Sequence, residues 1–285
     1  MLNKMYTLIT GASEGLGKAF ALECAKRDMN LVLVSLPQSG LENLAAFIRK
    51  NFPVSVLVFE KDLSDPLSCR QLFAEVRNRD LRLQMLINNA GIGSTAFFNE
   101  SNIEVHEKQI GLNVLATTLI TRLFLANLES NGPSYILNVG SMASFFFLPG
   151  KQVYGATKSY IHYFSKSLRK EVRRNGICVC VLCPGGINTN LSVTLLNRTG
   201  SWISKLAVLN PERVAKIALN GLLKDKPVII PGILNNIFML LDKLLPEFIK
   251  TNITNFGMNR LKVDNSYLKL WKRGASVPVK IDRVA

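Results

Sequence analysis

Hydrophobic residues occur along this chain in short continuous runs, separated by longer stretches in which they recur every three or four positions. Short, mainly apolar runs are typical of β-strands that are covered on both faces. Seven runs are predicted as strands: Tyr6–Thr10, Leu31–Ser35, Ser55–Glu60, Met85–Asn89, Tyr135–Ser141, Cys178–Cys183 and Val228–Pro231. The amphipathic stretches between them are predicted as helices: Gly15–Arg27, Leu41–Lys50, Pro66–Arg77, Asn102–Leu128, Val153–Arg174 and Pro211–Leu223.

This alternation of strand and helix predicts an α/β fold, with helices on both faces of a doubly wound parallel sheet of the Rossmann type. No internal repeat or low-complexity linker interrupts residues 1–231, so this part is predicted to be one three-layer α/β/α domain. Residues 232–285 fall outside the alternation and are predicted to be a helical C-terminal extension. The extension either covers the core or contacts another subunit as part of the same domain, or it lies on a membrane surface.

The composition is that of a folded protein with an excess of positive charge. Of 285 residues, 48% are hydrophobic and 19% are charged, and 35 Lys and Arg against 20 Asp and Glu give +15. Such an excess fits nucleic acid, an anionic membrane surface or an acidic small ligand. The sequence contains no motif that combines aromatic and basic residues and no DNA-recognition helix, so nucleic acid is not predicted as a partner.

The five cysteines are few and odd in number, so they do not predict a disulfide framework. Three of them, Cys178, Cys180 and Cys183, are expected to be buried strand residues, and no metal site is predicted. The apolar run at the start is too short for a signal peptide, and the stretch from Val228 to Leu241 is too short to span a bilayer. We therefore expect a cytoplasmic protein, with peripheral membrane contact through the extension as the alternative.

The first predicted strand runs directly into a glycine-rich turn, and the first helix follows. Glycines let the backbone approach a ligand, and a helix N-terminus supplies free N–H donors, so this arrangement is typical of a phosphate site. It is not a P-loop, because Ala12 stands where the first glycine would be and Ala19 where Ser or Thr would follow the lysine. A glycine-rich connection without a ligand is the other interpretation. The turn reads Thr10-Gly11-Ala12-Ser13-Glu14-Gly15-Leu16-Gly17.

The spacing Gly-x-x-x-Gly-x-Gly after a threonine resembles the short-chain dehydrogenase/reductase family. Five further elements of that family follow in the same order: Asp62-Leu63, Asn88-Asn89-Ala90-Gly91, Ser141 with Asn113 upstream, Tyr154-Gly155-Ala156-Thr157-Lys158, and Pro184-Gly185-Gly186-Ile187-Asn188-Thr189. The resemblance covers about residues 5–231 and is strongest to the ketoacyl and hydroxysteroid reductase branch, with its related bacterial reductases. It implies an enzyme that reduces a carbonyl group, or oxidises a secondary alcohol, with a nicotinamide dinucleotide.

Tyr154 and Lys158 are four residues apart in a helical pattern, so they share a face. A nearby ammonium lowers the pKa of a tyrosine, whose reference value is about 10, because it favours the phenolate. Tyr154 then exchanges a proton with the substrate oxygen, and Ser141 hydrogen-bonds the same oxygen. By resemblance, Lys158 also binds the nicotinamide ribose, and Asn113 supports a water-linked proton relay. The alternative is an ordinary amphipathic helix.

The resemblance implies a cofactor site in which Asp62 and Leu63 contact the adenine and Thr189 holds the carboxamide. The second predicted strand ends at Ser35 without an acidic residue that would repel a 2′-phosphate. NADP(H) is therefore favoured, and NAD(H) stays open because the basic residues typical of NADP-preferring members are missing. The residues expected to bind the cofactor are Gly11, Ser13, Glu14, Gly15, Leu16, Gly17, Ser35, Asp62, Leu63, Asn89, Ala90, Gly91, Tyr154, Lys158, Pro184, Gly185, Ile187 and Thr189.

Two segments that border the substrate in the family are notably apolar here: residues 142–149 after Ser141, and residues 191–206 after Thr189. They predict either a hydrophobic carbonyl or alcohol substrate, or packing against the core or a partner subunit. The predicted helix Val153–Arg174 often joins a subunit interface in the family, so a homo-oligomer, dimer or tetramer, is expected. For the whole chain, a non-catalytic dinucleotide-binding regulator or scaffold is the second hypothesis.

Overall fold

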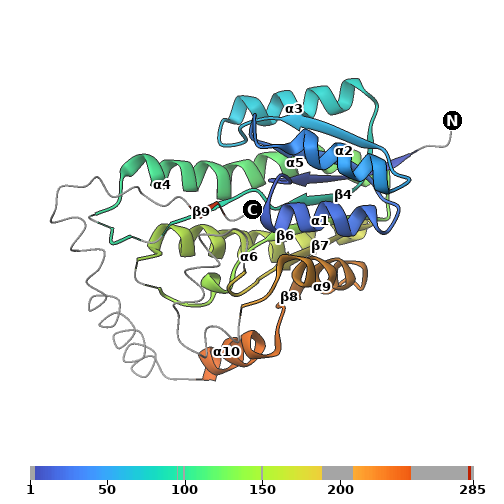
Figure 1. The fold of residues 1–285 in the computed structure, drawn as a ribbon. Helices are drawn as coiled ribbons and strands as arrows, with labels where there is room; N and C mark the ends of the chain where they lie inside the picture. The colour runs from blue at the N-terminus through green and yellow to red at the C-terminus, as the bar shows by residue number, and fades with distance from the viewer. Residues whose placement is uncertain are drawn as a thin grey trace.

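A seven-stranded parallel sheet forms the middle layer of the molecule (Figure 1). The computed structural model describes residues 4–94, 96–98, 100–148, 150–187, 208–244 and 282–283. The strands in spatial order are β3 (Val56–Glu60), β2 (Asn30–Ser35), β1 (Met5–Thr10), β4 (Arg82–Asn88), β6 (Ser134–Val139), β7 (Ile177–Leu182) and β8 (Val228–Ile229). All seven predicted strands are present, and the α/β Rossmann-type fold is confirmed.

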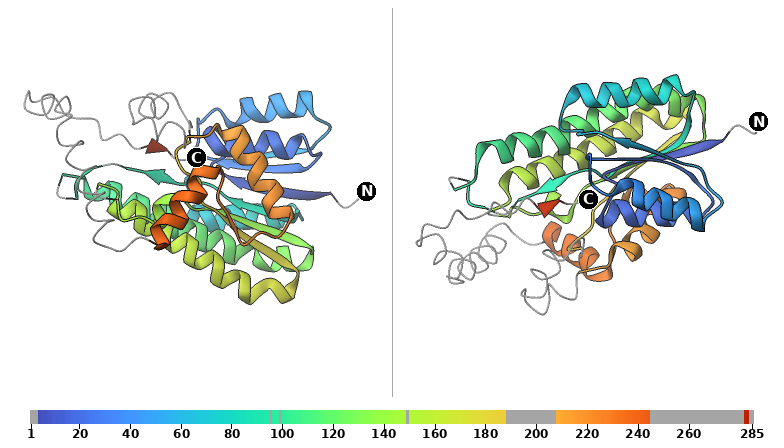
Figure 2. Two further views of the ribbon diagram at one scale, coloured as in Figure 1. Left: turned by 90° about the horizontal axis from the view of Figure 1, so that it is seen from below. Right: turned by 45° about the horizontal axis from the view of Figure 1, so that its top comes forward.

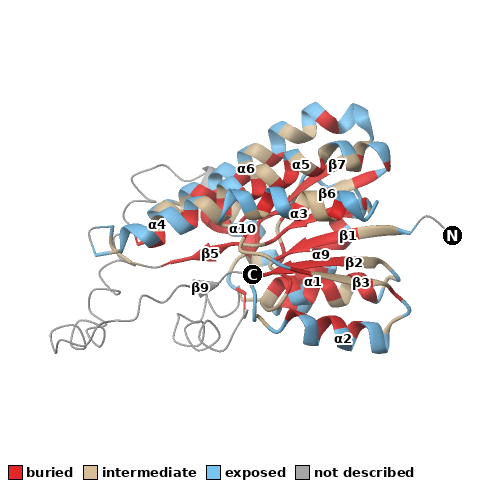
Figure 3. Ribbon diagram, turned by 90° about the horizontal axis from the view of Figure 1, so that it is seen from above, coloured by how far each residue is buried: buried red, intermediate tan, exposed pale blue. Residues whose placement is uncertain are grey.

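Helices cover both faces of this sheet, as the right-hand view in Figure 2 shows. One layer consists of α1 (Gly15–Ala25), α2 (Leu41–Asn51) and α9 (Pro211–Leu223). The other layer consists of α3 (Pro66–Asn78), α5 (Thr117–Ser130) and α6 (Gln152–Val172), with α4 (Ile103–Ile110) continuing α5 at its N-terminal end. Buried residues concentrate on the strands and on the helix faces turned towards them (Figure 3).

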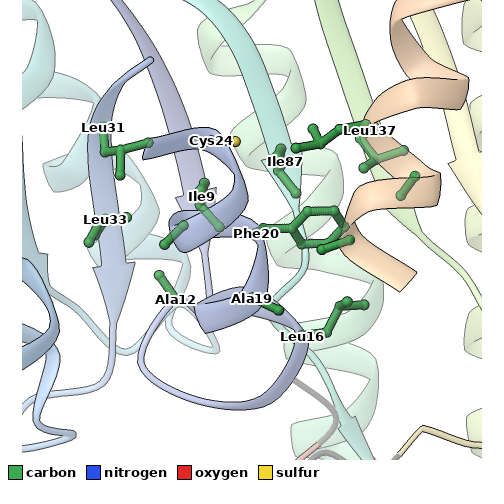
Figure 4. Packing of buried hydrophobic residues seen from close by; sticks show 14 of the residues in the cluster. Ile9, Ala12, Leu16, Ala19, Phe20, Cys24, Leu31, Leu33, Ile87 and Leu137 are labelled. Atoms are coloured by element: carbon green, nitrogen blue, oxygen red, sulfur yellow. The ribbon is translucent and has the colours of Figure 1, made fainter. Parts of the chain in front are cut away.

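Successive strand residues enter different layers, because side chains alternate across a sheet. Ile9 and Leu33 pack with Phe20 of α1 in one core cluster (Figure 4), whereas Leu8 and Val34 pack in the other, under α3 and α5. Both clusters consist of fully or nearly fully buried apolar residues. The strands are therefore apolar on both faces, which explains why their sequences are continuous hydrophobic runs rather than alternating ones.

The predicted single helix Asn102–Leu128 is divided in the structure. It forms α4, one π-helical segment η1 (Gly111–Ala116) and then α5. By length and composition, Ile103–Ser130 is the one helix in the described part of the chain that would be able to cross a membrane. Its α5 portion, however, packs Ile120 and Phe124 into the core beneath the sheet, as the core helix of a folded domain does.

Beyond β8 the chain enters the predicted extension, which begins with α10 (Ile233–Leu244), at the lower edge of Figure 1. A two-residue strand near the C-terminus, β9 (Asp282–Arg283), pairs antiparallel with β5 (Ile92–Gly93). Two 3₁₀ turns complete the described elements: η2 (Met142–Ser144) and η3 (Arg173–Asn175). The extension thus touches the domain next to the loop that follows β4.

Candidate active site

The glycine turn between β1 and α1 is held in a conformation that requires its glycines. Gly11 and Gly15 have φ values of 65° and 54°, in the region that favours glycine. A Cβ on Gly17 would lie 1.9 Å from the carbonyl oxygen of Gly11, and one on Gly11 would lie 2.9 Å from the Cα of Ala90. The turn therefore packs directly against backbone, and a larger residue does not fit at either position.

Two hydrogen-bonded groups join the glycine turn to the loop after β4. The Thr10 hydroxyl oxygen accepts hydrogen bonds from the backbone N–H groups of Asn89 and Ala90, both at 3.0 Å. The Asn89 amide nitrogen donates to the carbonyl oxygens of Thr10 and Gly11, at 3.0 and 3.2 Å. Because all of these groups are buried or half-buried, the two segments form one rigid wall at the carboxyl end of the sheet.

The N-terminus of α1 offers donors for an anionic group. Its N-cap residue Glu14 makes no side-chain hydrogen bond to the first turn, so the side chain leaves those backbone N–H groups available. Nearby, the hydroxyls of Ser13 and Ser35 lie 2.8 Å apart, so the turn is bonded to the end of β2. The glycine cradle and the uncapped helix together fit the pyrophosphate of a dinucleotide.

Asn113 lies in the π-helical segment η1 and is nearly fully buried. Its side-chain oxygen accepts from the Ile92 N–H at 2.9 Å, and its amide nitrogen donates to the Ile92 carbonyl at 2.9 Å and to the Thr157 hydroxyl at 3.0 Å. The extra residue of a π-turn re-aims a side chain relative to a regular helix. Asn113 thereby connects the loop after β4 to α6.

Ser141 does not end a strand, as the sequence predicted, because β6 stops at Val139. It is instead the N-cap of η2, and its side-chain oxygen accepts from the Ala143 N–H at 3.1 Å. Gly140, just before it, lies close to β7: its N–H donates to the Leu182 carbonyl at 2.7 Å, and a Cβ there would lie 3.2 Å from the same oxygen. The hydroxyl proton of Ser141 remains available for a second oxygen.

Tyr154 and Lys158 lie in the first two turns of α6, and both are buried. The Lys158 Nζ atom lies 5.8 Å from the centre of the Tyr154 ring and donates to the Val139 carbonyl at 2.9 Å. Burial lowers the pKa of Lys158 to about 8, because the charged form loses its hydration there. The ammonium is fixed next to the phenol, as the spacing in the sequence predicts.

Four further residues that the sequence predicts to bind the cofactor are Asp62, Leu63, Gly185 and Thr189, and the structure describes the first three. The carboxylate of Asp62 accepts a hydrogen bond from the Ser64 hydroxyl at 2.6 Å, and the side chain of Leu63 is buried beneath α3. Gly185 packs against the side chain of Asn235 in α10, so closely that a Cβ on Gly185 would lie 2.7 Å from Asn235 Oδ1. Thr189 lies outside the described residues, as does the apolar segment 191–206.

Sequence reasoning missed two residues that organise the site. Thr10 stands out in the sequence only as the residue before the glycines, although its hydroxyl binds the loop after β4. Thr157 stands between Tyr154 and Lys158, and its hydroxyl donates to the Tyr154 carbonyl at 2.7 Å while accepting from Asn113. A buried threonine inside a catalytic helix turn is the signal that would have pointed to it.

A sequence model described as short chain dehydrogenase matches residues 5–199 of the chain. The chain belongs to the short-chain dehydrogenase/reductase family. It is accordingly an oxidoreductase that acts on CH–OH and C=O groups with NAD(P). When bound, the nicotinamide cofactor supplies or accepts the hydride, and the protein orients the reacting groups.

Relatives of this short-chain dehydrogenase/reductase cover most of its length. The NADP-dependent 3-hydroxy acid dehydrogenase of Schizosaccharomyces pombe is 33% identical over 78% of this chain and 88% of its own. The very-long-chain 3-oxoacyl-CoA reductase of Anas platyrhynchos is 30% identical over 66% of this chain, and the match covers 61% of the reductase. A short-chain dehydrogenase from Sphingobium yanoikuyae in complex with NADPH is 31% identical, with a TM-score of 0.71 over 80% of this chain and 88% of its own.

Proposed function

We propose that this enzyme reduces a hydrophobic ketone or 3-oxo compound with NADP(H). Tyr154 is the proton donor, and Ser141 donates a hydrogen bond to the substrate oxygen. Lys158 is the cation that favours the phenolate form of Tyr154. The observation that carries the proposal is the buried Tyr154–Lys158 pair, with Lys158 Nζ anchored on the Val139 carbonyl. A buried ammonium beside a phenol is the arrangement that makes tyrosine an acid–base group near neutral pH.

In the reduction, Ser141 and Tyr154 both hydrogen-bond the carbonyl oxygen, and Tyr154 passes its proton to that oxygen as negative charge develops there. The ammonium group of Lys158 stabilises the negative charge that Tyr154 then carries. In the proposed site, Lys158 also binds the ribose of the cofactor. Asn113 bonds to Ile92 in the loop after β4 and to Thr157 in α6, so it fixes the position of this loop relative to the catalytic helix. In the oxidation of an alcohol, the same groups move the proton in the opposite direction.

The preference for NADP(H) is supported by the end of β2, where Ser35 is followed by no acidic residue. The Ser13 and Ser35 hydroxyls at this edge are able to bond a phosphate oxygen. The solved relative from Sphingobium yanoikuyae contains NADPH. Steady-state rates with NADPH and NADH test the preference, and a higher kcat/KM with NADH would contradict it.

The hydrophobic substrate is supported by the segment between Ser141 and Tyr154. Phe145 packs against the core near Ile161, whereas Phe147 and Leu148 are 86% and 41% exposed. The two relatives named for 3-hydroxy acids and very-long-chain 3-oxoacyl-CoA act on oxygen at the third carbon of an acyl chain. A panel of apolar ketones and 3-oxoacyl thioesters of increasing chain length tests the proposal. We expect kcat/KM to rise with chain length, and equal turnover of short polar ketones would contradict it.

We also propose that the enzyme is a homo-oligomer that associates through the outer face of η1 and α6. Leu115, Tyr160 and Tyr163 are 40%, 39% and 76% exposed there, and the Tyr160 hydroxyl lies 2.9 Å from that of Thr118. Light scattering of purified protein tests this proposal. Tyr163→Arg should shift the mass towards the monomer, and Phe47→Arg, which changes an exposed aromatic residue on α2, should not.

For the extension, we propose peripheral contact with an anionic membrane through α10. Ile233, Ile237 and Leu240 recur at four- and three-residue spacing and are 82%, 45% and 55% exposed. Residues 226–285 carry 10 Lys and Arg against 4 Asp and Glu, a difference of +6 that favours an anionic surface. Flotation with anionic vesicles tests this, and equal recovery of wild-type protein and an Ile237→Ser/Leu240→Ser variant would contradict it.

A further inference from the structure

The ring of Tyr154 is approached by two ammonium groups rather than one. Lys158 Nζ lies 5.8 Å from the ring centre, and Lys151 Nζ lies at 5.4 Å. Both distances are within the range, about 6 Å, at which a cation is attracted to an aromatic ring. Lys158 belongs to the motif that identifies the site, whereas nothing in that motif assigns a role to Lys151, three residues before Tyr154.

The backbone of Lys151 is fixed by the turn that leads into α6. Its N–H donates to the Leu148 carbonyl at 3.0 Å, and its carbonyl accepts from the Gly155 N–H at 2.7 Å. Lys151 is the N-cap residue of α6, and Tyr154 lies in the first turn that follows. A negative charge in the first turn of a helix is also favoured by the helix dipole, so both effects act on the phenolate in the same direction.

In the described part of the chain, α6 and the end of β7 both bring titratable groups to this pair. Lys151 and Lys158 belong to the N-terminal part of α6, and Cys183 follows β7 and interacts with Lys158. Burial raises the pKa of the Cys183 thiol to about 12, so this group is neutral at physiological pH and does not offset either ammonium.

We propose that Lys151 is a second cation of the reaction centre, which stabilises the anionic form of Tyr154 and thereby assists proton transfer. Lys151 acts through Tyr154 and is not itself placed on the substrate or the cofactor. The proposal rests on the proposed role of Tyr154 as the proton-transfer group. Its physical basis is Coulombic: at similar distances from one ring, the two ammonium groups must favour the phenolate in the same sense.

The size of the effect follows from the different exposure of the two lysines. Lys158 is 2% exposed, whereas Lys151 is only half-buried, so water screens its charge more strongly. Lys151 Nζ lies 5.4 Å from the ring centre, and a charge near that distance in this partly screened setting shifts the pKa of a phenol by about half a unit to one unit. Removing the Lys151 charge should therefore raise the pKa of Tyr154 by that amount, without changing the cofactor site.

The experiment measures the ionisation of Tyr154 without requiring turnover. Protein with ¹³C at the tyrosine ζ carbon is titrated by NMR, and the Tyr154→Phe variant identifies the Tyr154 signal among the 6 tyrosines. Lys151→Met should raise the Tyr154 midpoint by about half a unit to one unit, and Lys151→Arg should leave it unchanged. Lys166→Met removes the same charge from an exposed position on α6 and should also leave it unchanged.

An unchanged midpoint in Lys151→Met, or an equal shift in Lys166→Met, would overturn the proposal. In alcohol oxidation by active enzyme, the acidic limb of the kcat/KM profile should move upward by the same amount as the NMR midpoint. Absence of turnover in the wild-type enzyme would refute the proposed function alone, because the titration would still report whether Lys151 acts on Tyr154.

Discussion

The amide nitrogen of Asn113 donates a hydrogen bond to the hydroxyl of Thr157 at 3.0 Å. Asn113 also binds both backbone groups of Ile92, and Thr157 binds the Tyr154 carbonyl. The loop after β4 is thus tied to the catalytic turn of α6 through two buried side chains. In the proposed site, this connection sets the distance between the cofactor and the proton donor.

Replacing Thr157 with valine removes this connection while keeping the shape of the side chain. The buried amide of Asn113 then loses a partner, which costs about 1–3 kcal/mol, and the relative position of Tyr154 loosens. We expect kcat to fall about tenfold to a hundredfold, with the cofactor Kd within about twofold of the wild type. Thr157→Ser keeps the oxygen and should restore kcat. Equal losses in both variants would show that the hydroxyl does not position Tyr154.

Replacing Lys158 with methionine should abolish activity but stabilise the fold. The pKa of about 8 means that the charged lysine is poorly tolerated where it is buried. At neutral pH, denaturant unfolding should show the variant to be about 1–3 kcal/mol more stable than the wild type. The gain is smaller than the lowered pKa of Lys158 alone implies, because the variant loses the hydrogen bond from Lys158 to the Val139 carbonyl. A less stable variant would contradict this prediction.

The stability difference of Lys158→Met should also depend on pH. The folded pKa of Lys158 is about 8 and the ordinary pKa of lysine is 10.5, so between these values the unfolded wild-type chain binds more protons than the folded one. Wild-type stability therefore gains with rising pH in this window, and the advantage of the variant should shrink there. Unfolding curves at pH values from 7 to 10.5 test this, and a constant difference would contradict it.

Gly17→Ala should be far more harmful than Gly40→Ala. A Cβ at Gly17 meets the Gly11 carbonyl oxygen at 1.9 Å, whereas one at Gly40 meets only the Asn43 side chain, at 4.0 Å. We expect a loss of about 3 kcal/mol or more at Gly17 and about 1 kcal/mol at Gly40, where only the positive φ is strained. Urea unfolding measures both, and equal losses would contradict the close packing of the turn.

The contact between Gly185 and Asn235 predicts that the loop after β7 and α10 are energetically coupled. Gly185→Ala should destabilise the protein by about 1–3 kcal/mol, because the new methyl group meets the Asn235 amide. In an Asn235→Ala background the same change should cost about 0.5 kcal/mol or less. A double-mutant cycle by chemical unfolding tests the coupling, and strict additivity would contradict it.

Much of the fold was predictable because its signals are local. Continuous apolar runs identified all seven strands of the sheet, and the glycine turn identified the start of α1. The sequence predicts Ser141 at a strand end, but the chain leaves β6 two residues earlier to form the η2 turn. Beyond β6, the Gly140 N–H still donates to the Leu182 carbonyl at 2.7 Å, and this backbone contact between distant segments has no signal in the side-chain pattern of the sequence.

The π-turn around Asn113 was not predicted either, because its period differs from that of an α-helix by one residue in a single turn. The backbone partners of Asn113 and Lys158 were not predictable either, since the carbonyl groups of Ile92 and Val139 would be present with any residue type. Sequence patterns thus identified Ser141, Tyr154 and Lys158, whereas their hydrogen-bond partners became known only from the structure.

The central claim is that Tyr154 transfers the proton in carbonyl reduction. The most direct measurement is kcat of the wild type and of Tyr154→Phe with NADPH and the best ketone of the panel, together with the NADPH Kd of each. We predict that kcat falls roughly 10²- to 10⁴-fold while Kd stays within about twofold. A Tyr154→Phe enzyme that retained wild-type kcat would contradict the account.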